Sequence, residues 1–337
     1  MYFFLGITLV LALLLTINAT ATMAAAGASR LSRRLLARCS ARTRAEILFV
    51  MRIAPPAIAI VAIAAFMIPS YLKYEPHSTG ESVSLKLGAL ATVSAVGVGV
   101  AIWRGLRSWR ATRSLLRGWL ASSTRIQLET IAVPAFVLRH TFPIIAVVGA
   151  LRPRLFIADQ VLESLSKDEL AAAIAHECGH LAARDNFKRT VMRVSRAALL
   201  IIPCGRSLDR AWSEASESAA DEFAAQRSSL VALNLASALV RIAKMIPKGQ
   251  GGQIMPASVS AFLAAHEDGP RVKVRVRRLV ELAATDPQLL VSNAPWFRFL
   301  PWLSLTAFVM LGVTIESRPQ VLAAVHAFVE QVVRLLS

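Results

Sequence analysis

Cysteine is scarce in this chain of 337 residues: there are three, Cys39, Cys178 and Cys204. All three fall in segments that the arginine distribution, described below, assigns to the cytosol, where thiols stay reduced. A disulfide framework is therefore excluded. The chain also lacks internal repeats, and its only low-complexity stretch is KGQGGQ at residues 248–253.

Acidic residues are also few. The chain has 21 Asp and Glu against 38 Lys and Arg, a formal charge of +17, yet only 18% of its residues are charged and 55% are hydrophobic. Soluble proteins are about one quarter charged, so this composition is typical of a membrane protein. An excess of positive charge can also indicate nucleic-acid binding, but base-stacking aromatics are sparse among the arginines. Trp103, Trp109 and Trp119 have spacings that suit a membrane interface better, so we expect no direct nucleic-acid partner.

Four segments have little or no charge. Residues 2–28 have none at all, and at about 1.5 Å per residue they exceed a hydrocarbon core of ~30 Å. Residues 47–72 are interrupted only by Arg52 and by Pro55-Pro56, and residues 87–103 are rich in Ala, Gly and Val. Residues 295–315 form the last run. The sequence thus predicts four transmembrane helices, at 1–28, 47–72, 87–103 and 295–315.

Two arginine blocks flank these runs. They comprise Arg30, Arg33, Arg34, Arg38, Arg42 and Arg44, and then Arg104, Arg107, Arg110, Arg113, Arg117 and Arg125. The positive-inside rule assigns both blocks to the cytosol. It predicts a multi-pass protein of the inner or plasma membrane with a basic cytosolic loop at 29–46, an external loop at 73–86 and a cytosolic domain at 104–294. Both termini would lie outside. A cleaved signal peptide is the alternative for the first run, which however lacks a preceding basic region.

The external tail at 316–337 has apolar residues at helical spacing. This pattern fits an amphipathic helix lying in the membrane interface, and it fits a self-associating helix equally well. A homo-oligomer is therefore left open.

The stretch AHECGHLAARDN at residues 175–186 carries two histidines four positions apart. Residues at i and i+4 lie one above the other on a helix, so His176 and His180 can hold one metal ion. Glu177 can then reach a water molecule beside that ion. The pattern H-E-x-x-H is typical of zinc peptidases, in which the glutamate is the general base and acid. The alternative, two solvated histidines, is disfavoured by the Ala, Ile and Leu residues around them.

Two capping residues mark the start of this helix. Ser166 is a favourable N-cap, and Glu169 three positions later completes a capping box. Cys178 is two positions from His176, so it points away from the metal and is interpreted as a small packed side chain.

A third ligand is expected from the Ala-rich stretch DRAWSEASESAADEFAAQ, which reads as a helix. Glu217 and Asp221 are four apart and face the same way, so one can bind the metal while the other hydrogen-bonds a ligand histidine. Asp185 is a further candidate for the latter role. Glu214 and Glu222 are rival ligands. The alternative without a metal is that these acids form an exposed face of the helix.

A family resemblance adds to this reading. The run GALRPRLFIADQVLESLSKDELAAAIAHECGHLAARDN resembles the membrane-embedded zinc protease domain of the β-lactam-sensing receptor-transducers. Shared features are a Pro after a basic residue, a short strand, LS-x-x-E-L, and HE-x-x-H followed by RDN. The chain is more distantly similar to the CAAX prenyl proteases and their bacterial heat-shock relatives, which share a downstream E-x-x-x-D, here Glu217 to Asp221. The resemblance covers roughly residues 132–282.

The resemblance implies one Zn²⁺ per chain held by His176, His180 and Glu217, with Asp221 supporting them. It departs from the receptors at the end of the chain. They carry a penicillin-binding sensor after their last span, whereas only SRPQVLAAVHAFVEQVVRLLS stands here, so we expect no such sensor in this chain.

Two further segments gain meaning from the resemblance. FPIIAVVGALRPRLFIAD has β-branched runs on both sides of Gly149, which predicts a hairpin. In zincins an edge strand pairs with the substrate backbone, and a purely structural hairpin fits equally well. HEDGPRVKVRVRRL is similar to a turn and Arg-rich helix of the relatives, which implies His266 or Arg271 as an oxyanion stabiliser. A solvated basic helix near anionic lipid is the alternative for most of these arginines.

The predicted fold is thus a mainly α integral membrane protein with four spans and a cytosolic zincin-like α+β domain carrying a small hairpin or sheet. The predicted function is zinc endopeptidase activity at the cytosolic membrane face, directed at a repressor or signalling protein. Quality control of membrane proteins is one alternative. A non-catalytic adaptor that holds zinc is another, but structural zinc needs no general base, so Glu177 favours the enzyme.

Overall fold

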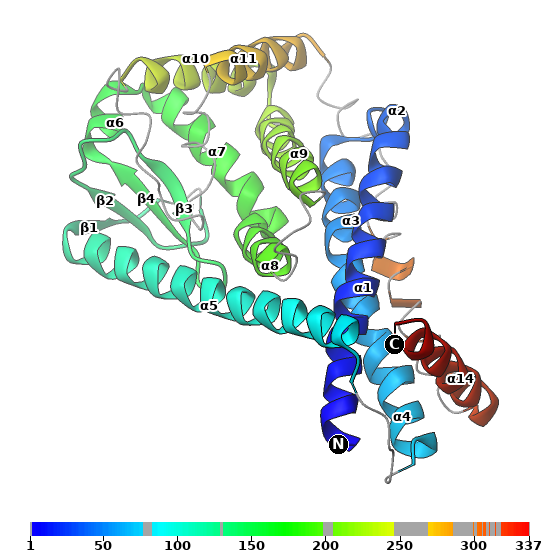
Figure 1. Ribbon diagram of the computed structural model, residues 1–337. Coiled ribbons are helices and arrows are strands. Elements are labelled where there is room, and N and C mark those ends of the chain that lie inside the picture. The colour runs from blue at the N-terminus through cyan, green and yellow to red at the C-terminus, as the bar shows by residue number, and fades with distance from the viewer. Residues whose placement is uncertain are drawn as a thin grey trace.

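The computed structural model describes residues 2–76, 83–128, 131–197, 205–245, 269–285 and 318–336, with isolated positions between 299 and 314. In these residues the chain is mostly helical and holds one four-stranded sheet (Figure 1). The fourth predicted span, residues 295–315, lies largely outside the described residues. Its prediction is therefore not tested.

Three helical segments are long and apolar enough to cross a membrane. They are α1 (Tyr2–Leu31), the continuous segment formed by α3 (Ala41–Val61), the π-helical η1 (Ala62–Met67) and α4 (Ile68–Tyr74), and α5 (Leu85–Ala121). Short α2 (Arg33–Leu36) joins the first two. These three agree with the first three predicted spans.

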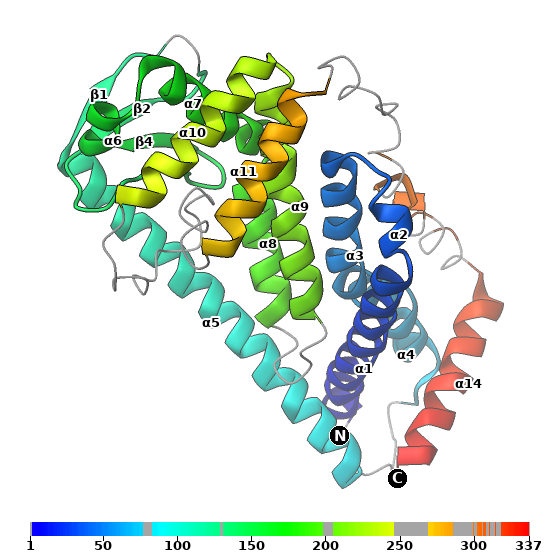
Figure 2. The same ribbon diagram turned by 90° about the horizontal axis from the view of Figure 1, so that it is seen from above.

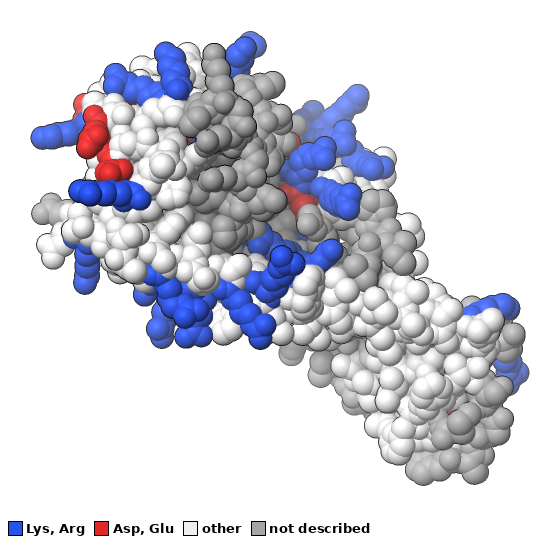
Figure 3. Space-filling view, turned by 60° about the vertical axis from the view of Figure 1, so that its left-hand side comes forward, with Lys and Arg blue, Asp and Glu red and all other residues white. Residues whose placement is uncertain are grey.

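The outer surface of these helices carries large apolar side chains. Phe3, Phe4 and Ile7 on α1 are each more than half exposed, as expected for groups that face lipid. Figure 3 shows few charges on the described surface of the elongated end of the molecule, whereas Lys and Arg gather elsewhere. On this face the apolar end carries Lys and Arg only near its tip, and the other charges gather toward the sheet and its helices.

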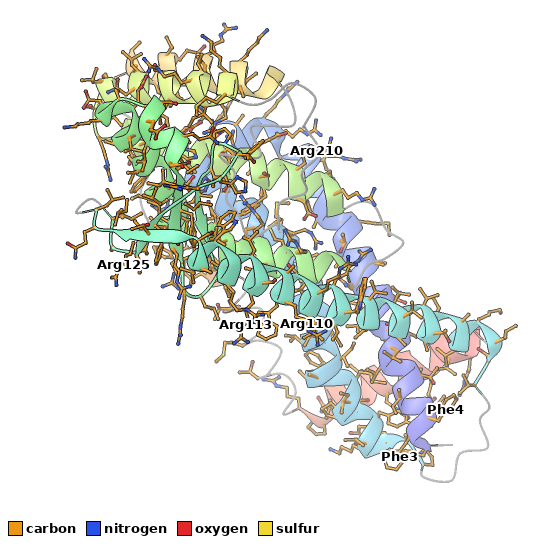
Figure 4. The ribbon with its side chains drawn as sticks, turned by 90° about the vertical axis from the view of Figure 1, so that its left-hand side faces the viewer. Phe3, Phe4, Arg110, Arg113, Arg125 and Arg210 are labelled. Carbon is orange, nitrogen blue, oxygen red and sulfur yellow. The ribbon has the colours of Figure 1, made fainter. Side chains whose placement is uncertain are left out.

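The helix α5 continues far beyond Trp103, where the third span was predicted to end. It runs obliquely from the apolar bundle to the sheet (Figures 1 and 2) and carries arginines along its second half. Arg107 and Arg113 lie over the rings of Trp103 and Trp109, with guanidinium carbons 5.2 and 5.3 Å from the ring centroids. Figure 4 shows Arg110 and Arg113 on α5, well away from Phe3 and Phe4 at the far end of α1.

The sheet consists of β1 (Ser123–Ile126), β2 (Ala135–Leu138), β3 (Ile145–Val148) and β4 (Arg154–Ala158), in the order β1-β2-β4-β3. Strands β2 and β4 are parallel, and the other pairs are antiparallel. The predicted hairpin is confirmed as β3–β4, with Ile145 opposite Ile157. Its turn requires glycine, because Gly149 has φ +107° and a Cβ there would lie 2.6 Å from the carbonyl oxygen of Arg152.

Helices cover this sheet and connect it to the apolar bundle. They are α6 (Asp159–Ser164), α7 (Lys167–Ala183), α8 (Asp185–Ala197), α9 (Gly205–Ala225), α10 (Ser229–Met245) and α11 (Gly269–Ala283). The sheet, α7, α10 and Leu279 of α11 share one apolar core. The predicted capping box is present at the start of α7, where Ser166 accepts from the Glu169 N–H and Glu169 accepts from the Ser166 N–H.

The tail forms α14 (Pro319–Leu336), which packs on α4. The Ser70 hydroxyl donates to the carbonyl of Leu322 at 2.8 Å, and the Tyr74 hydroxyl donates to the carbonyl of Pro319 at 3.0 Å. The described tail is therefore helical, as its apolar spacing predicts, and is fixed against the second apolar segment.

Helix α9 links the bundle to the sheet. It packs along α3 through Leu208 and Trp212, which share a core with Leu48 and Phe49. Arg52, the one charge within the second apolar run, is 1% exposed and donates from Nε to Asp209 Oδ1 at 2.8 Å. A buried guanidinium needs such an anion, because an unpaired buried charge is costly.

The pair predicts a measurable effect on stability. We expect Asp209→Asn to lower the free energy of unfolding by about 3 kcal/mol, because it leaves Arg52 buried without its anion. The double variant Arg52→Met/Asp209→Ala should recover most of this loss, since neither charge remains. Unfolding midpoints in detergent micelles measure both, with the exposed Glu163→Gln as control. An Asp209→Asn midpoint equal to that of wild type would contradict the assignment.

Candidate metal centre

Two histidines of α7 face each other inside the protein. His176 and His180 are 0% and 2% exposed, and their Nε2 atoms lie 3.2 Å apart. The four-residue spacing therefore brings both ring nitrogens to one point, as the sequence predicts. The alternative of two solvated histidines is wrong.

Glu217 of α9 completes the group. Its Oε2 lies 3.7 Å from His176 Nε2, and its Oε1 lies 3.6 Å from His180 Nε2. One ligand atom from each residue can be chosen so that all lie within 4.8 Å of one another. Two nitrogens at ~2.0–2.1 Å from a tetrahedral zinc ion are about 3.3 Å apart, so the observed 3.2 Å separation of the histidines fits such an ion.

Glu222 and Glu214, the two rival ligands, do not point toward the histidines. Glu222 forms an ion pair with Arg278 and accepts the Ala41 N–H at 3.1 Å. Glu214 is exposed on the surface of α9 that faces the ends of α1 and α3. The helical register of α9 thus directs Glu217, rather than its neighbours, toward the histidines.

Carboxylates hold the far side of each histidine ring. Asp221 Oδ1 lies 2.9 Å from His176 Nδ1, and Asp185 Oδ2 lies 2.7 Å from His180 Nδ1. The Ser216 hydroxyl donates to the same Asp185 oxygen at 2.7 Å. These contacts favour the tautomers that carry hydrogen on Nδ1 and leave both Nε2 lone pairs directed at Glu217.

Glu217 and Asp185 control the protonation of His180. Burial alone would lower its pKa, but Glu217 and Asp185 outweigh burial and raise the pKa of His180 to about 9. Burial raises the pKa of the Asp185 carboxyl, and its contact with His180 outweighs burial and keeps that pKa below its usual value. The carboxylates around His180 therefore stabilise positive charge on its imidazole.

Arg275 of α11 closes the group from one side. Its Nη2 and Nε lie 2.7 and 3.0 Å from the two oxygens of Asp221, and its Nη1 lies 3.2 Å from Glu217 Oε2. Burial raises the pKa of the Asp221 carboxyl, but Arg275 and His176 overcome this and lower it well below its usual range. Asp221 is therefore an anion at neutral pH.

Arg275 was missed by the sequence analysis, which named His266 or Arg271. His266 lies outside the described residues, and Arg271 lies in the first turn of α11, one helical turn before Arg275. The Arg-rich segment was the correct signal, but spacing alone does not say which arginine turns inward. The oxyanion role of His266 or Arg271 stays a prediction.

The strand β3 fixes Glu177. The Val147 N–H donates to Glu177 Oε2 at 3.0 Å, which orients a carboxylate that is 0% exposed. The Asn186 amide donates to the Val147 carbonyl at 2.8 Å. Both main-chain groups of Val147 are thus bonded within the chain, so the predicted pairing of the edge strand with substrate is not available at this residue.

The residues after the second histidine therefore have separate structural tasks. Arg184 adopts a left-handed conformation, φ 54°, which ends α7 and starts α8 at once. This sharp turn carries Asp185 back to His180 and Asn186 to β3. A non-glycine residue in this conformation costs about 1–2 kcal/mol, and the two buried side-chain contacts hold it in place.

Gly179 permits the close crossing of α7 and α9. A Cβ at this position would lie 2.9 Å from the Ala220 Cα, which belongs to a helix backbone and cannot move alone. Glycine is therefore required for α9 to bring Glu217 and Asp221 within reach of the histidines.

We expect Gly179→Ala to displace α9 and to weaken zinc binding about ten- to hundredfold, as loss of supporting contacts around metal ligands commonly does. Zinc retained against a competing chelator measures this. The neighbouring Cys178→Ala is the matched control, because Cys178 is a half-buried thiol that packs on the core rather than at the crossing. Equal zinc affinity in the Gly179→Ala protein would contradict this role of the crossing.

Residues 139–208 of the chain match the family model of peptidase family M48. The match begins just after β2 and ends in the first turn of α9, so it contains β3, β4 and the α7 motif but neither Glu217 nor Asp221. No curated protein and no solved structure matches the chain. The match supports a zinc metallopeptidase family and does not distinguish the receptor type from the prenyl-protease type.

Proposed function

We propose that the chain is an integral membrane zinc endopeptidase that cleaves protein substrates at the cytosolic membrane face. One observation carries the proposal. The Nε2 atoms of His176 and His180 lie 3.2 Å apart beside the Glu217 carboxylate, and the adjacent Glu177 is oriented by the Val147 N–H. The match to peptidase family M48 and the three apolar helices support the same conclusion.

The proposed architecture has four transmembrane helices and a cytosolic zincin-like domain at residues 104–294. It keeps the basic loop 29–46 and the domain on the cytosolic side, and both termini, the loop 73–86 and the tail 316–337 on the outer side of the inner or plasma membrane. Three of these spans coincide with apolar helices, and the arginine blocks stand at one end of them. The fourth span, 295–315, rests on its sequence alone.

His176, His180 and Glu217 would hold one zinc ion, with Asp221 and Asp185 fixing the imidazoles. When bound, zinc acidifies a water molecule and polarises the scissile carbonyl. Arg275 neutralises Asp221 and contacts Glu217, which keeps both carboxylates in position.

Glu177 is the proposed proton carrier. Its Oε2 is anchored by Val147, so the carboxylate presents Oε1 to the water that attacks the peptide carbonyl. The carboxylate takes a proton from this water and then delivers it to the leaving amine nitrogen. The anchor matters because a proton carrier must sit within hydrogen-bond reach of both atoms in turn.

A non-catalytic adaptor would need the metal ligands but not Glu177. Burying a carboxylate is costly even when it accepts a hydrogen bond, and Glu177 is 0% exposed next to the histidines, which supports the catalytic role over the adaptor. The substrate is proposed to be a cytosolic repressor or signalling protein, as the receptor resemblance implies. Quality control of membrane proteins is the competing role for the same chemistry.

We expect Glu177→Gln to retain zinc and the fold but to lose peptide cleavage, because the amide cannot accept the proton. We expect His180→Ala to lose zinc as well. Zinc content by elemental analysis and cleavage of a peptide mixture by the purified protein measure the two effects. Glu163→Gln and His326→Ala, which change residues far from the centre, are matched controls. Cleavage by the Glu177→Gln protein would falsify the mechanism.

The inactive Glu177→Gln protein also separates the two candidate roles. We expect it to retain a small soluble regulator when purified from membranes beside wild type, because a substrate binds but is not released as products. Mass spectrometry identifies what is enriched. A broad set of membrane proteins instead of a single regulator would indicate quality control.

A further inference from the structure

A cavity of about 580 Å³ opens beside the candidate metal centre, between α9, α11 and the ends of α1, α2 and α3. Glu217 and Arg275 belong to its lining and to the metal centre alike. The volume lies within the range of ligand pockets, about 300–1,000 Å³. A molecule in this cavity therefore touches a metal ligand and the arginine that holds it.

The wall formed by α9 consists mostly of small side chains. Ser207, Ala211, Ala215 and Ser218 recur on one side of the helix and leave the space open. Leu36 and Leu48 from the opposite side add apolar surface. The cavity thus has room for an extended polypeptide and apolar surface for its side chains.

The charges around the cavity are unbalanced. Arg30, Arg33 and Arg44 line it, and within the described part of the chain none of the three forms an ion pair within 4 Å. Arg44 interacts electrostatically with Glu222 and Glu214, and also with Arg278. Against them stand Glu214 and Glu217, and Glu217 is already in contact with Arg275. A concave surface lined by excess positive charge concentrates anions.

We propose that this cavity binds the substrate polypeptide on one side of the scissile bond and selects acidic side chains there through Arg30, Arg33 and Arg44. The inference rests on the proposed endopeptidase function and adds the substrate class, a segment rich in Asp or Glu. A polypeptide is favoured over an anionic lipid because the cavity shares residues with the metal centre. Glu217, which lines the cavity, lies 3.7 Å from His176 Nε2 and 3.6 Å from His180 Nε2, so a polypeptide in the cavity lies beside the metal centre.

The test uses full-length, zinc-loaded protein in bilayer discs of neutral lipid, incubated with a peptide mixture made from a whole-cell digest. Mass spectrometry maps the cuts. Wild type is expected to cut beside Asp- and Glu-rich segments. In Arg30→Gln/Arg33→Gln and in Arg44→Gln this preference is lost. For an acidic peptide, kcat/KM falls about tenfold, mainly through KM, whereas its Asn/Gln counterpart is cut at an unchanged rate.

The matched control is Arg34→Gln/Arg38→Gln. It removes two charges from the same exposed segment but from residues that do not line the cavity, so the acidic preference is retained. Equal loss in this variant would mean that net charge alone is responsible and would overturn the inference.

Further outcomes separate this inference from the proposed function. Cleavage that depends on zinc and Glu177 but shows no acidic preference overturns the inference and leaves the endopeptidase standing. If no such cleavage occurs, the proposed endopeptidase function is refuted. Fluorescence polarisation of labelled acidic peptides with the Glu177→Gln protein then still tests whether the cavity binds acidic polypeptide. Binding that depends on the three arginines supports it, and binding independent of them overturns it. If the arginine substitutions change only the amount of phosphatidylglycerol that the purified protein retains, and not peptide binding, the cavity binds anionic lipid instead.

Discussion

Buried carboxylates need cationic or hydrogen-bonding partners, and the centre of this molecule is arranged around that requirement. Asp221, Asp185 and Glu217 are all withdrawn from water, and each contacts a histidine, an arginine or a hydroxyl. The carboxylates and their partners together come from α7, α8, α9 and α11, so satisfying the charges fixes four helices relative to one another. Removing one of these side chains would leave its partner as a buried charge without a counter-charge, which is costly in a low-dielectric interior.

Helix α9 connects this charged centre with the apolar bundle. Its first half packs against α3 and holds Arg52 through Asp209, and its second half carries Glu217 and Asp221. A straight α-helix transmits a shift along its axis with little loss, because its hydrogen bonds are all internal. The position of the candidate metal-binding carboxylate Glu217 is therefore set in part by the packing of an apolar segment.

Much of the candidate site could be predicted from the sequence because it depends on local helix geometry. The capping box at Ser166 and the facing histidines follow from local helix geometry. Glu217 was favoured over Glu214 and Glu222 by its pairing with Asp221 and by the family resemblance, because the period alone does not fix the rotation of α9. The hairpin was predictable from β-branched runs around Gly149. Arg275 was not, because its inward turn depends on how α11 packs against α9, which is a property of the tertiary structure. Strands β1 and β2 were also missed, since four-residue strands give little periodic signal.

The tasks of Gly179 and Asn186 were likewise hidden from sequence reasoning. A glycine within a helix reads as a weak point until the neighbouring helix is seen to cross there. An asparagine at the start of a helix reads as polar surface until its strand partner is known. Both depend on residues distant in the chain, which no local pattern contains.

The unbroken helix α5 acts as a spacer. Its apolar first half and its arginine-bearing second half are one rod, and the sheet follows directly from its end. From Arg104 to Ala121 the rod is about 27 Å long at ~1.5 Å per residue. Because no loop interrupts it, the sheet and the helices packed on it cannot drift freely from the apolar bundle. If the apolar helices span a membrane as proposed, the centre would reach only polypeptide segments that come within a fixed distance of the lipid surface.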